Sequence, residues 1–169
     1  VLSFNDGSDA LLGGIYWWPR EFSLESYQAV FQSPDIIWAF GISVLRTVIG
    51  TVTHVFFTGM TAYAFSKKHL PFRGFFLAVG TFTMFFNGGL IPTFLLFKEL
   101  HLLDNFLVYI LPTMFNFFHL IIFMSFFREL PESIEESALI DGANEFVIFV
   151  RIILPLSTAV IATIALFHG

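Results

Sequence analysis

Long apolar stretches separated by short polar connections are the feature that most limits how this chain can fold. Three of them, at about residues 36–65, 74–97 and 106–127, are long enough for a helix that crosses a bilayer, for which about 20 predominantly apolar residues suffice. A fourth apolar stretch, residues 156–169, is long enough only for the start of a span. We therefore expect an all-α membrane protein, a multi-span helical bundle with three full spans and a truncated fourth.

The composition supports a membrane protein and narrows the kinds of site that the chain can form. Of its 169 residues, 56% are apolar and 12% are charged, whereas about 25% of the residues of a soluble domain are charged. No basic tract indicates binding to nucleic acid, and the sequence has no cysteine for disulfides or thiolate metal ligands. Because it begins at Val1, without an initiator methionine, and ends within a short apolar stretch, we expect a fragment of a longer protein.

The charged connections predict how the spans are oriented. If the three spans alternate across the membrane, residues 66–73 and 128–155 lie on one side, and residues 1–35 and 98–105 lie on the other. The first side holds Lys67, Lys68, Arg73, Arg128 and Arg151, and the second side holds Arg20 and Lys98. Since cytoplasmic connections are enriched in Lys and Arg, the first side is predicted to be cytoplasmic.

Polar side chains recur within the spans at steps of three and four residues, which places them on one face of a helix. Such a face must contact protein or water, because unpaired polar groups in hydrocarbon are costly. Two interpretations stay open, a wall of a translocation path or hydrogen bonding between helices. The candidate path residues are Thr47, Thr51, His54, Asn87, Asn116 and His119. No spacing supports a metal site on the two histidines and a carboxylate, so no metal is expected.

Two spans carry residues that disturb a helix. Asn87-Gly88-Gly89 and Pro92, near the middle of the second span, predict a kink or a break there. Pro112 predicts a kink in the third span. Broken helices near the middle of the bilayer often border transport sites.

Residues 128–155, the polar insert, hold six of the thirteen acidic residues of the chain and separate two apolar stretches. Pro131 suits the first turn of a helix, and acidic residues favour its N-terminal half through the helix dipole. We interpret Glu132 and Glu135 as parts of a solvated helix face. Gly142 supplies the left-handed residue that ends a helix.

A second short helix is predicted after this turn. Asn144 can cap it, and Pro155 ends it or bends it into the next span. Its apolar face is predicted to consist of Phe146, Phe149, Val150 and Ile153. The insert is therefore a helix–turn–helix that either docks another protein or lies on the membrane surface.

Glu136-Ser137-Ala138, Gly142, Ile152 and Leu154-Pro155 follow one another at set intervals across the insert. This spacing resembles the cytoplasmic signature loop of ABC importer permeases, which usually reads Glu-Ala-Ala, then Gly, then Ile-x-Leu-Pro. Only Ser137 departs from that pattern, and serine is a small replacement for alanine. Residues 87–94, 102–105 and 138–143 are similar to the carbohydrate-uptake branch, in particular to oligosaccharide permeases of Gram-positive bacteria.

The resemblance implies the transmembrane domain of a type I ABC importer, in which the polar insert is the coupling loop that docks on a separate cytoplasmic ATPase dimer. It also implies a second permease subunit in a heterodimer, an extracytoplasmic solute-binding protein, a sugar substrate, and a multi-pass position among the lipids of a bacterial cell membrane. ATP and magnesium would bind to the ATPase, because this chain has no phosphate-binding loop, and we expect no catalytic residue or bound cofactor in it. The implied coupling residues are Glu136, Ser137, Ala138, Asp141, Gly142, Ala143, Ile152, Leu154 and Pro155.

Two other functions fit parts of the sequence. The predicted break in the second span and the polar face would also suit an ion-coupled secondary transporter or channel that works without an ATPase. A membrane scaffold, in which the insert docks another protein, would carry no substrate. Copurification of a separate ATPase would distinguish the first function from the transporter that works alone.

Overall fold

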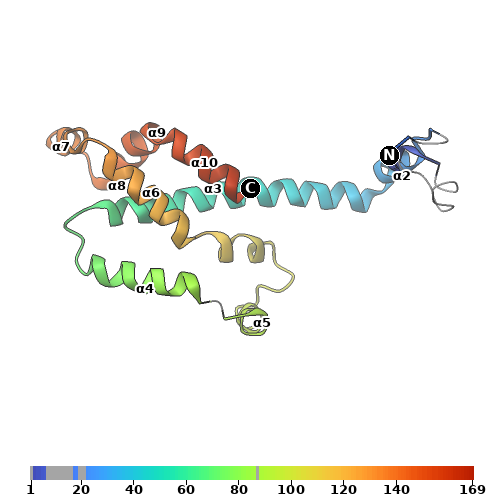
Figure 1. The fold of residues 1–169 in the computed structure, drawn as a ribbon, viewed down its shortest axis with the longest axis horizontal. Coiled ribbons are helices and arrows are strands. Elements are labelled where there is room, and N and C mark those ends of the chain that lie inside the picture. Colours follow the sequence, from blue (N-terminus) through green and yellow to red (C-terminus); the bar gives the residue numbers. More distant parts are fainter. Residues whose placement is uncertain (1, 7–16, 19–21, 87) are drawn as a thin grey trace. The chain divides into compact units, whose positions relative to one another are not determined.

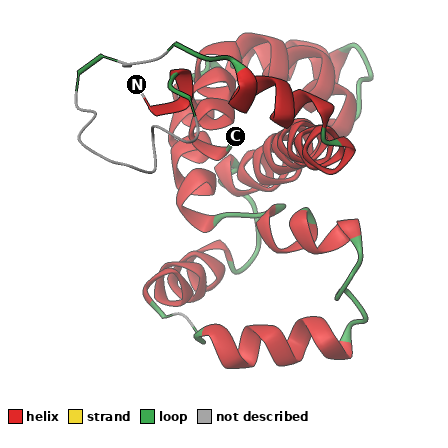
Figure 2. Cartoon of the chain, turned by 90° about the vertical axis from the view of Figure 1, so that its right-hand side faces the viewer, coloured by secondary structure: helices red, strands yellow, loops and turns green. Residues whose placement is uncertain are grey.

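In the described part of the chain, loops and turns connect helices (Figure 2). An isolated bridge pairs Asn5 with Phe22. The computed structural model describes residues 2–6, 17–18, 22–86 and 88–169. The chain divides into two compact units, residues 1–45 and 46–169. The predicted all-α class is therefore confirmed for the residues described.

The N-terminal unit is held together by aromatic contacts. Its elements are η1 (Leu2–Phe4), α2 (Glu25–Gln32) and the first part of α3 (Pro34–Ser66). The ring of Phe4 stacks on Phe22 with centroids 5.8 Å apart and lies 5.1 Å from the ring of Tyr27. The hydroxyl groups of Ser3 and Tyr27 lie 3.0 Å apart. These contacts join the start of the chain to α2.

α3 confirms the first predicted span. Its 33 residues form one unbroken helix, of about 50 Å at about 1.5 Å per residue, which exceeds a bilayer core of about 30 Å. Pro34 suits the first position of a helix, because an N–H there would have no intrahelical partner, and Asp35 in the first turn favours the helix dipole. Among the described residues, α3 is the one helix that is long and apolar enough to cross a membrane by itself.

The other apolar stretches form broken helices. In the described ranges, three pairs of segments are long and apolar enough to span a membrane only if each pair makes one bent span. They are α4 (Arg73–Phe85) with α5 (Leu90–Glu99), the 3-10 turns η2 (Phe106–Tyr109) and η3 (Leu111–Thr113) with α6 (Phe117–Glu129), and α8 (Glu145–Ile148) through α9 (Leu154–Leu156) with α10 (Thr158–His168).

The break predicted in the second span is present. α4 ends at Phe85, and α5 begins at Leu90. Gly89, just before α5, has a φ of +84°, which residues with side chains rarely adopt. Pro92 lies in the first turn of α5, where its missing N–H costs no intrahelical bond. Asn87 lies outside the described residues.

The third span departs further from a regular helix than the predicted kink at Pro112. Two 3-10 turns precede α6, and the two parts are bent by 51°. Pro112 has no N–H to donate, and its ring crowds the preceding turn. Asn116 then starts α6, because its backbone is extended and its side-chain oxygen accepts a hydrogen bond from the backbone N–H of His119 at 3.1 Å.

The core of the C-terminal unit lies among α3, α6, α10 and the π-helical segment η4 (Phe149–Ile153). In Figure 1, α6 and α10 run beside the C-terminal half of α3. The almost fully buried side chains here include those of Ala62, Leu120, Phe123, Phe149, Ile153 and Ile164. The same core therefore holds α6, which leads into the polar insert, and η4, which belongs to the insert.

Truncating a central side chain tests this core. Phe123 is fully buried, so Phe123→Ala is expected to lower the free energy of unfolding of the purified protein by about 3–5 kcal/mol through the cavity it leaves. Phe118→Ala, on the same helix, is the control, because its side chain is 54% exposed. Thermal unfolding in detergent measures both, and an equal loss in the two variants would contradict the described packing.

Candidate functional site

The first helix that lies wholly within the polar insert is α7 (Glu132–Ile140), which follows α6 after only Leu130 and Pro131. Pro131 occupies the cap position, one residue before the predicted first turn. Carboxylates in the first turn of α7 favour its dipole, as expected. A short helix is thus joined directly to the end of α6.

Gly142 ends α7 as predicted. Its φ is +82°, the backbone N–H of Ala143 donates to the carbonyl of Ala138 at 3.0 Å, and its own N–H donates to the carbonyl of Leu139 at 3.0 Å. These two bonds form a Schellman motif, which satisfies carbonyls that the helix end would leave free. The buried Ala138 and half-buried Ala143 pack on the core beside it.

The second arm of the insert also begins as predicted, but its buried face differs. Asn144 caps α8, since its side-chain oxygen accepts a hydrogen bond from the N–H of Val147 at 2.8 Å. The predicted apolar face was wrong in half of its members, because Phe146 and Val150 are exposed while Phe149 and Ile153 are buried. Residues 149–153 form a π-helix, whose wider turn rotates the buried side away from the face that an α-helix would present.

Pro155 accounts for the change of helix type in the turn before it. It cannot donate a hydrogen bond, and its ring crowds the carbonyl one turn earlier. The segment from Glu145 to Leu156 and the helix α10 are bent by 83° at Ser157. The predicted bend into the next apolar stretch is thus present, but it lies two residues after Pro155.

The predicted coupling residues divide by exposure. Those open to solvent are Glu136, Ser137, Asp141, Gly142 and Pro155; Ala138 is buried, and Ala143, Ile152 and Leu154 are half-buried. Two apolar side chains beside the turn, Leu139 and Ile140, are also exposed, the second by 86%. The turn therefore presents polar and apolar groups together, as a docking surface for another protein requires.

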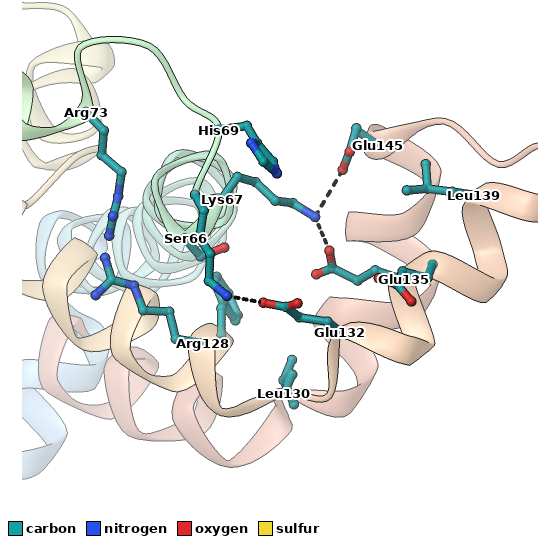
Figure 3. A pocket seen from close by; sticks show the side chains of 13 residues that line it. Ser66, Lys67, His69, Arg73, Arg128, Leu130, Glu132, Glu135, Leu139 and Glu145 are labelled. Carbon is teal, nitrogen blue, oxygen red and sulfur yellow. Dashed lines mark hydrogen bonds and ion pairs between the residues drawn. The ribbon is translucent and has the colours of Figure 1, made fainter.

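Lys67, just after the end of α3, lies between the two arms of the insert (Figure 3). Its Nζ donates to Oε2 of Glu135 on α7 and lies 3.4 Å from Oε2 of Glu145 on α8. Tyr63 donates its hydroxyl to that Glu145 oxygen at 2.8 Å, and its ring centroid lies 4.3 Å from the Lys67 amine. These four side chains are called the Lys67 cluster below.

A second ion pair lies further out. Lys68 Nζ donates to Glu132 Oε1 at 2.7 Å, with the two side chains 77% and 73% exposed. This hydrogen bond lowers the pKa of Glu132 and raises the pKa of Lys68. Because the Glu132 pKa is lowered on folding, its stabilising contribution is present above the ordinary carboxyl pKa and is lost as the pH falls through the lowered value. Such exposed pairs contribute little to stability.

The interpretation of Glu132 and Glu135 as a solvated face holds for one of them. Glu132 is exposed, but the Glu135 side chain is only 21% exposed and is paired with Lys67.

Sequence reasoning also missed Tyr63 and Lys67 as partners of the insert. The available signal was charge complementarity, since the basic residues 66–73 and the acidic insert were predicted on one side of the membrane. Side chains of both segments line an open pocket of about 490 Å³.

Within the spans, the structure brings His54 of α3 and His119 of α6 together. Nε2 of His54 lies 2.8 Å from Nδ1 of His119, and Nδ1 of His54 lies 2.7 Å from the carbonyl oxygen of Thr113. Because a carbonyl only accepts, His54 Nδ1 carries the hydrogen. When the His54 ring is neutral, its Nε2 accepts from His119 Nδ1–H. His168 of α10, which sequence reasoning did not single out, stacks on His54 with ring centroids 3.9 Å apart.

Polar side chains of α3 form hydrogen bonds with the segment before α6. The irregular backbone before α6 leaves carbonyls without helical partners, and His54 donates to that of Thr113. Thr58 donates to the carbonyl of Met114 over a longer distance of 3.4 Å. The surroundings of His54 therefore fit hydrogen bonding between helices, the second of the two interpretations left open by the sequence.

The remaining candidate path residues do not join this group. Thr47 is exposed, Asn116 caps α6, and Asn87 lies outside the described residues. The buried hydroxyl oxygen of Thr51 has no hydrogen-bond partner among the described residues. In the same ranges, no group of three or more His, Cys, Asp or Glu side chains is arranged to hold a metal ion.

A substitution at Gly142 tests the turn by itself. An added Cβ would meet nothing within 4 Å, so Gly142→Ala should introduce only the strain of the left-handed conformation, about 1–2 kcal/mol. We expect faster proteolytic cleavage within the insert and a lower unfolding temperature. Gly142→Asn is the control, because Asn adopts this conformation more readily. The same loss in both variants would show that the positive φ is not the cause.

No protein-family model matches the chain. It is, however, similar along nearly its whole length to two proteins of Bacillus subtilis (strain 168). It is 43% identical over 167 residues to Protein LplC, covering 99% of this chain and 57% of that protein. It is 47% identical over 151 residues to the polygalacturonan/rhamnogalacturonan transport system permease protein YtcP, covering 89% of this chain and 53% of that protein.

A solved structure shares the fold. It is the crystal structure of a bacterial ABC transporter involved in the import of the acidic polysaccharide alginate, with a TM-score of 0.90 and 32% identity, covering 99% of this chain and 60% of that one. The chain thus spans less than two thirds of the length of these proteins. The chain is therefore similar to ABC transporter permeases, and the similar proteins include permeases of carbohydrate uptake systems.

Proposed function

We propose that the chain is part of the permease subunit of an ATP-driven importer that moves a sugar or oligosaccharide across the cell membrane. The observation that carries this proposal is the polar insert, which combines the signature spacing with a helix–Gly142 turn–helix on which Glu136, Ser137 and Gly142 are exposed. The names of the similar permeases support a carbohydrate substrate.

The insert is suited to transmit movement from an ATPase to the membrane helices. α7 follows α6 almost immediately, and the second arm continues through η4 and α9 into α10. When ATP binding closes an ATPase dimer, a displacement of α7 would therefore reach two membrane helices through short, helical connections. The exposed Glu136, Ile140 and Gly142 would lie at the contact with the ATPase.

The proposed complex contains further partners. A second permease subunit would complete the translocation path, and an extracytoplasmic solute-binding protein would deliver the sugar. ATP and magnesium would bind only to the ATPase, so this chain acts as a transport component without catalysis of its own. We also propose that it lies in the cell membrane of a Gram-positive bacterium, which its similarity to two Bacillus subtilis proteins supports.

A charge at the turn tests the docking role. In the full-length permease, Gly142→Asp is expected to reduce the amount of copurifying ATPase and to abolish sugar-stimulated ATP hydrolysis, because it adds a carboxylate and backbone strain at the contact surface. Ser133→Asp is the control, since it adds the same charge to an exposed position earlier in α7. Unchanged ATPase binding and transport in Gly142→Asp would refute the docking role.

The substrate class is tested on the reconstituted wild-type complex with its solute-binding protein. We expect an oligosaccharide to stimulate ATP hydrolysis, and the panel should compare fragments of acidic polysaccharides with neutral oligosaccharides. The acidic set is included because similar proteins are named for polygalacturonan and alginate. Transport driven by an ion gradient without ATP would contradict the proposed function.

A further inference from the structure

The Lys67 cluster links α3 to the polar insert, from which α3 is separated in the chain by the whole second and third spans. The insert is continuous with α6 on one side and with α10 on the other. At the end of α3, Tyr63 binds Glu145 of α8, and Lys67 binds both Glu145 and Glu135 of α7. One carboxylate from each arm of the insert is therefore held by the end of α3 (Figure 3).

Lys67 is the only cation within ion-pair distance of Glu135 or Glu145 among the described residues. The Lys67 and Glu135 side chains are 27% and 21% exposed, so solvent screens their attraction less than that of the exposed Lys68–Glu132 pair. Without Lys67, the two carboxylates would face each other with no counter-charge and would repel. One ammonium group thus holds α7 to α8 and holds both to α3.

Two levels of polar contact then join the part of α3 after Leu45 to the rest of the C-terminal unit. The Lys67 cluster lies at one end of α3, and the His54–His119 hydrogen bond lies about three turns away along the helix, at 3.6 residues per turn. A helix held at two points follows its neighbours as a rigid body, and the buried core between the two points supports the same behaviour.

We propose that Lys67 is a positioning residue for energy coupling, through which α3 follows the displacement of α7 and α8 when an ATPase acts on the insert. This inference rests on the proposed function. Lys67 acts through Glu135 and Glu145 and need not touch the ATPase. Its loss should leave ATPase binding at the Gly142 turn intact while reducing the transport that each ATP drives.

The first test compares coupling in the full-length complex reconstituted in liposomes. In Lys67→Gln, the number of sugar molecules transported per ATP should fall about tenfold, within the range of measured coupling effects, while the amount of bound ATPase stays unchanged. Lys68→Gln is the matched control and should keep wild-type coupling. Wild-type coupling in Lys67→Gln would overturn the proposal, whereas a wild-type complex without ATP-driven transport would refute the proposed function instead.

Charge exchange separates this positioning role from a general need for lysine. Lys67→Glu alone should uncouple transport, and the double variant Lys67→Glu with Glu135→Lys should restore much of it by reversing the ion pair. Lys67→Arg should retain coupling. If Lys67→Gln fails to assemble, these variants still decide the question, because an exchange that restores nothing would overturn the proposal.

A distance measurement tests the movement directly. The 169 residues contain no cysteine, so spin labels can be attached to cysteines introduced at the exposed positions Ala64 and Ser133, with any cysteine elsewhere in the protein replaced. In the otherwise wild-type complex, the distance between the labels should stay the same with and without ATP. In Lys67→Gln, it should broaden or shift when ATP binds. An ATP-dependent change in the otherwise wild-type complex would overturn the proposal.

Discussion

The need to satisfy backbone carbonyls within a membrane explains the polar contacts between α3 and the segment before α6. Pro112 and the extended Asn116 interrupt the helical hydrogen-bond pattern within an apolar stretch, where unpaired backbone groups are costly. His54 donates to the carbonyl of Thr113, and Asn116 accepts from the first turn of α6. A break in one helix is thus compensated by side chains of a neighbouring helix, which fixes how the two pack.

The conformation of the polar insert is determined mostly by hydrogen bonds between residues that are close in the sequence. A Schellman turn at Gly142 and the cap at Asn144 form within a few residues of sequence. The insert is anchored in the hydrophobic core of the C-terminal unit by η4, whose Phe149 and Ile153 are buried against α3, α6 and α10. The insert therefore has one face anchored in the core and a turn that is free to contact a partner, which is the division that a coupling element between two proteins needs.

Local signals in the sequence predicted the features that short-range chemistry controls. The unbroken first span, the break after Phe85, the left-handed Gly142 and the cap at Asn144 were all found where expected. The face of the second arm was predicted incorrectly, because α-helical periodicity was assumed where a π-helix forms. A change of helix type depends on Pro155 together with the packing of Phe149, and a periodic pattern contains no information about that combination.

The sequence by itself determined the membrane class, the apolar stretches and the signature spacing of the insert, because hydropathy, proline and glycine act over short ranges. Only the tertiary structure decided which polar groups meet. It paired His54 with His119 and brought Lys67 between Glu135 and Glu145, residues separated by 68 and 78 positions in the chain. Such contacts arise when helices pack, so charge complementarity in the sequence could indicate the segments involved but not the atoms that bind.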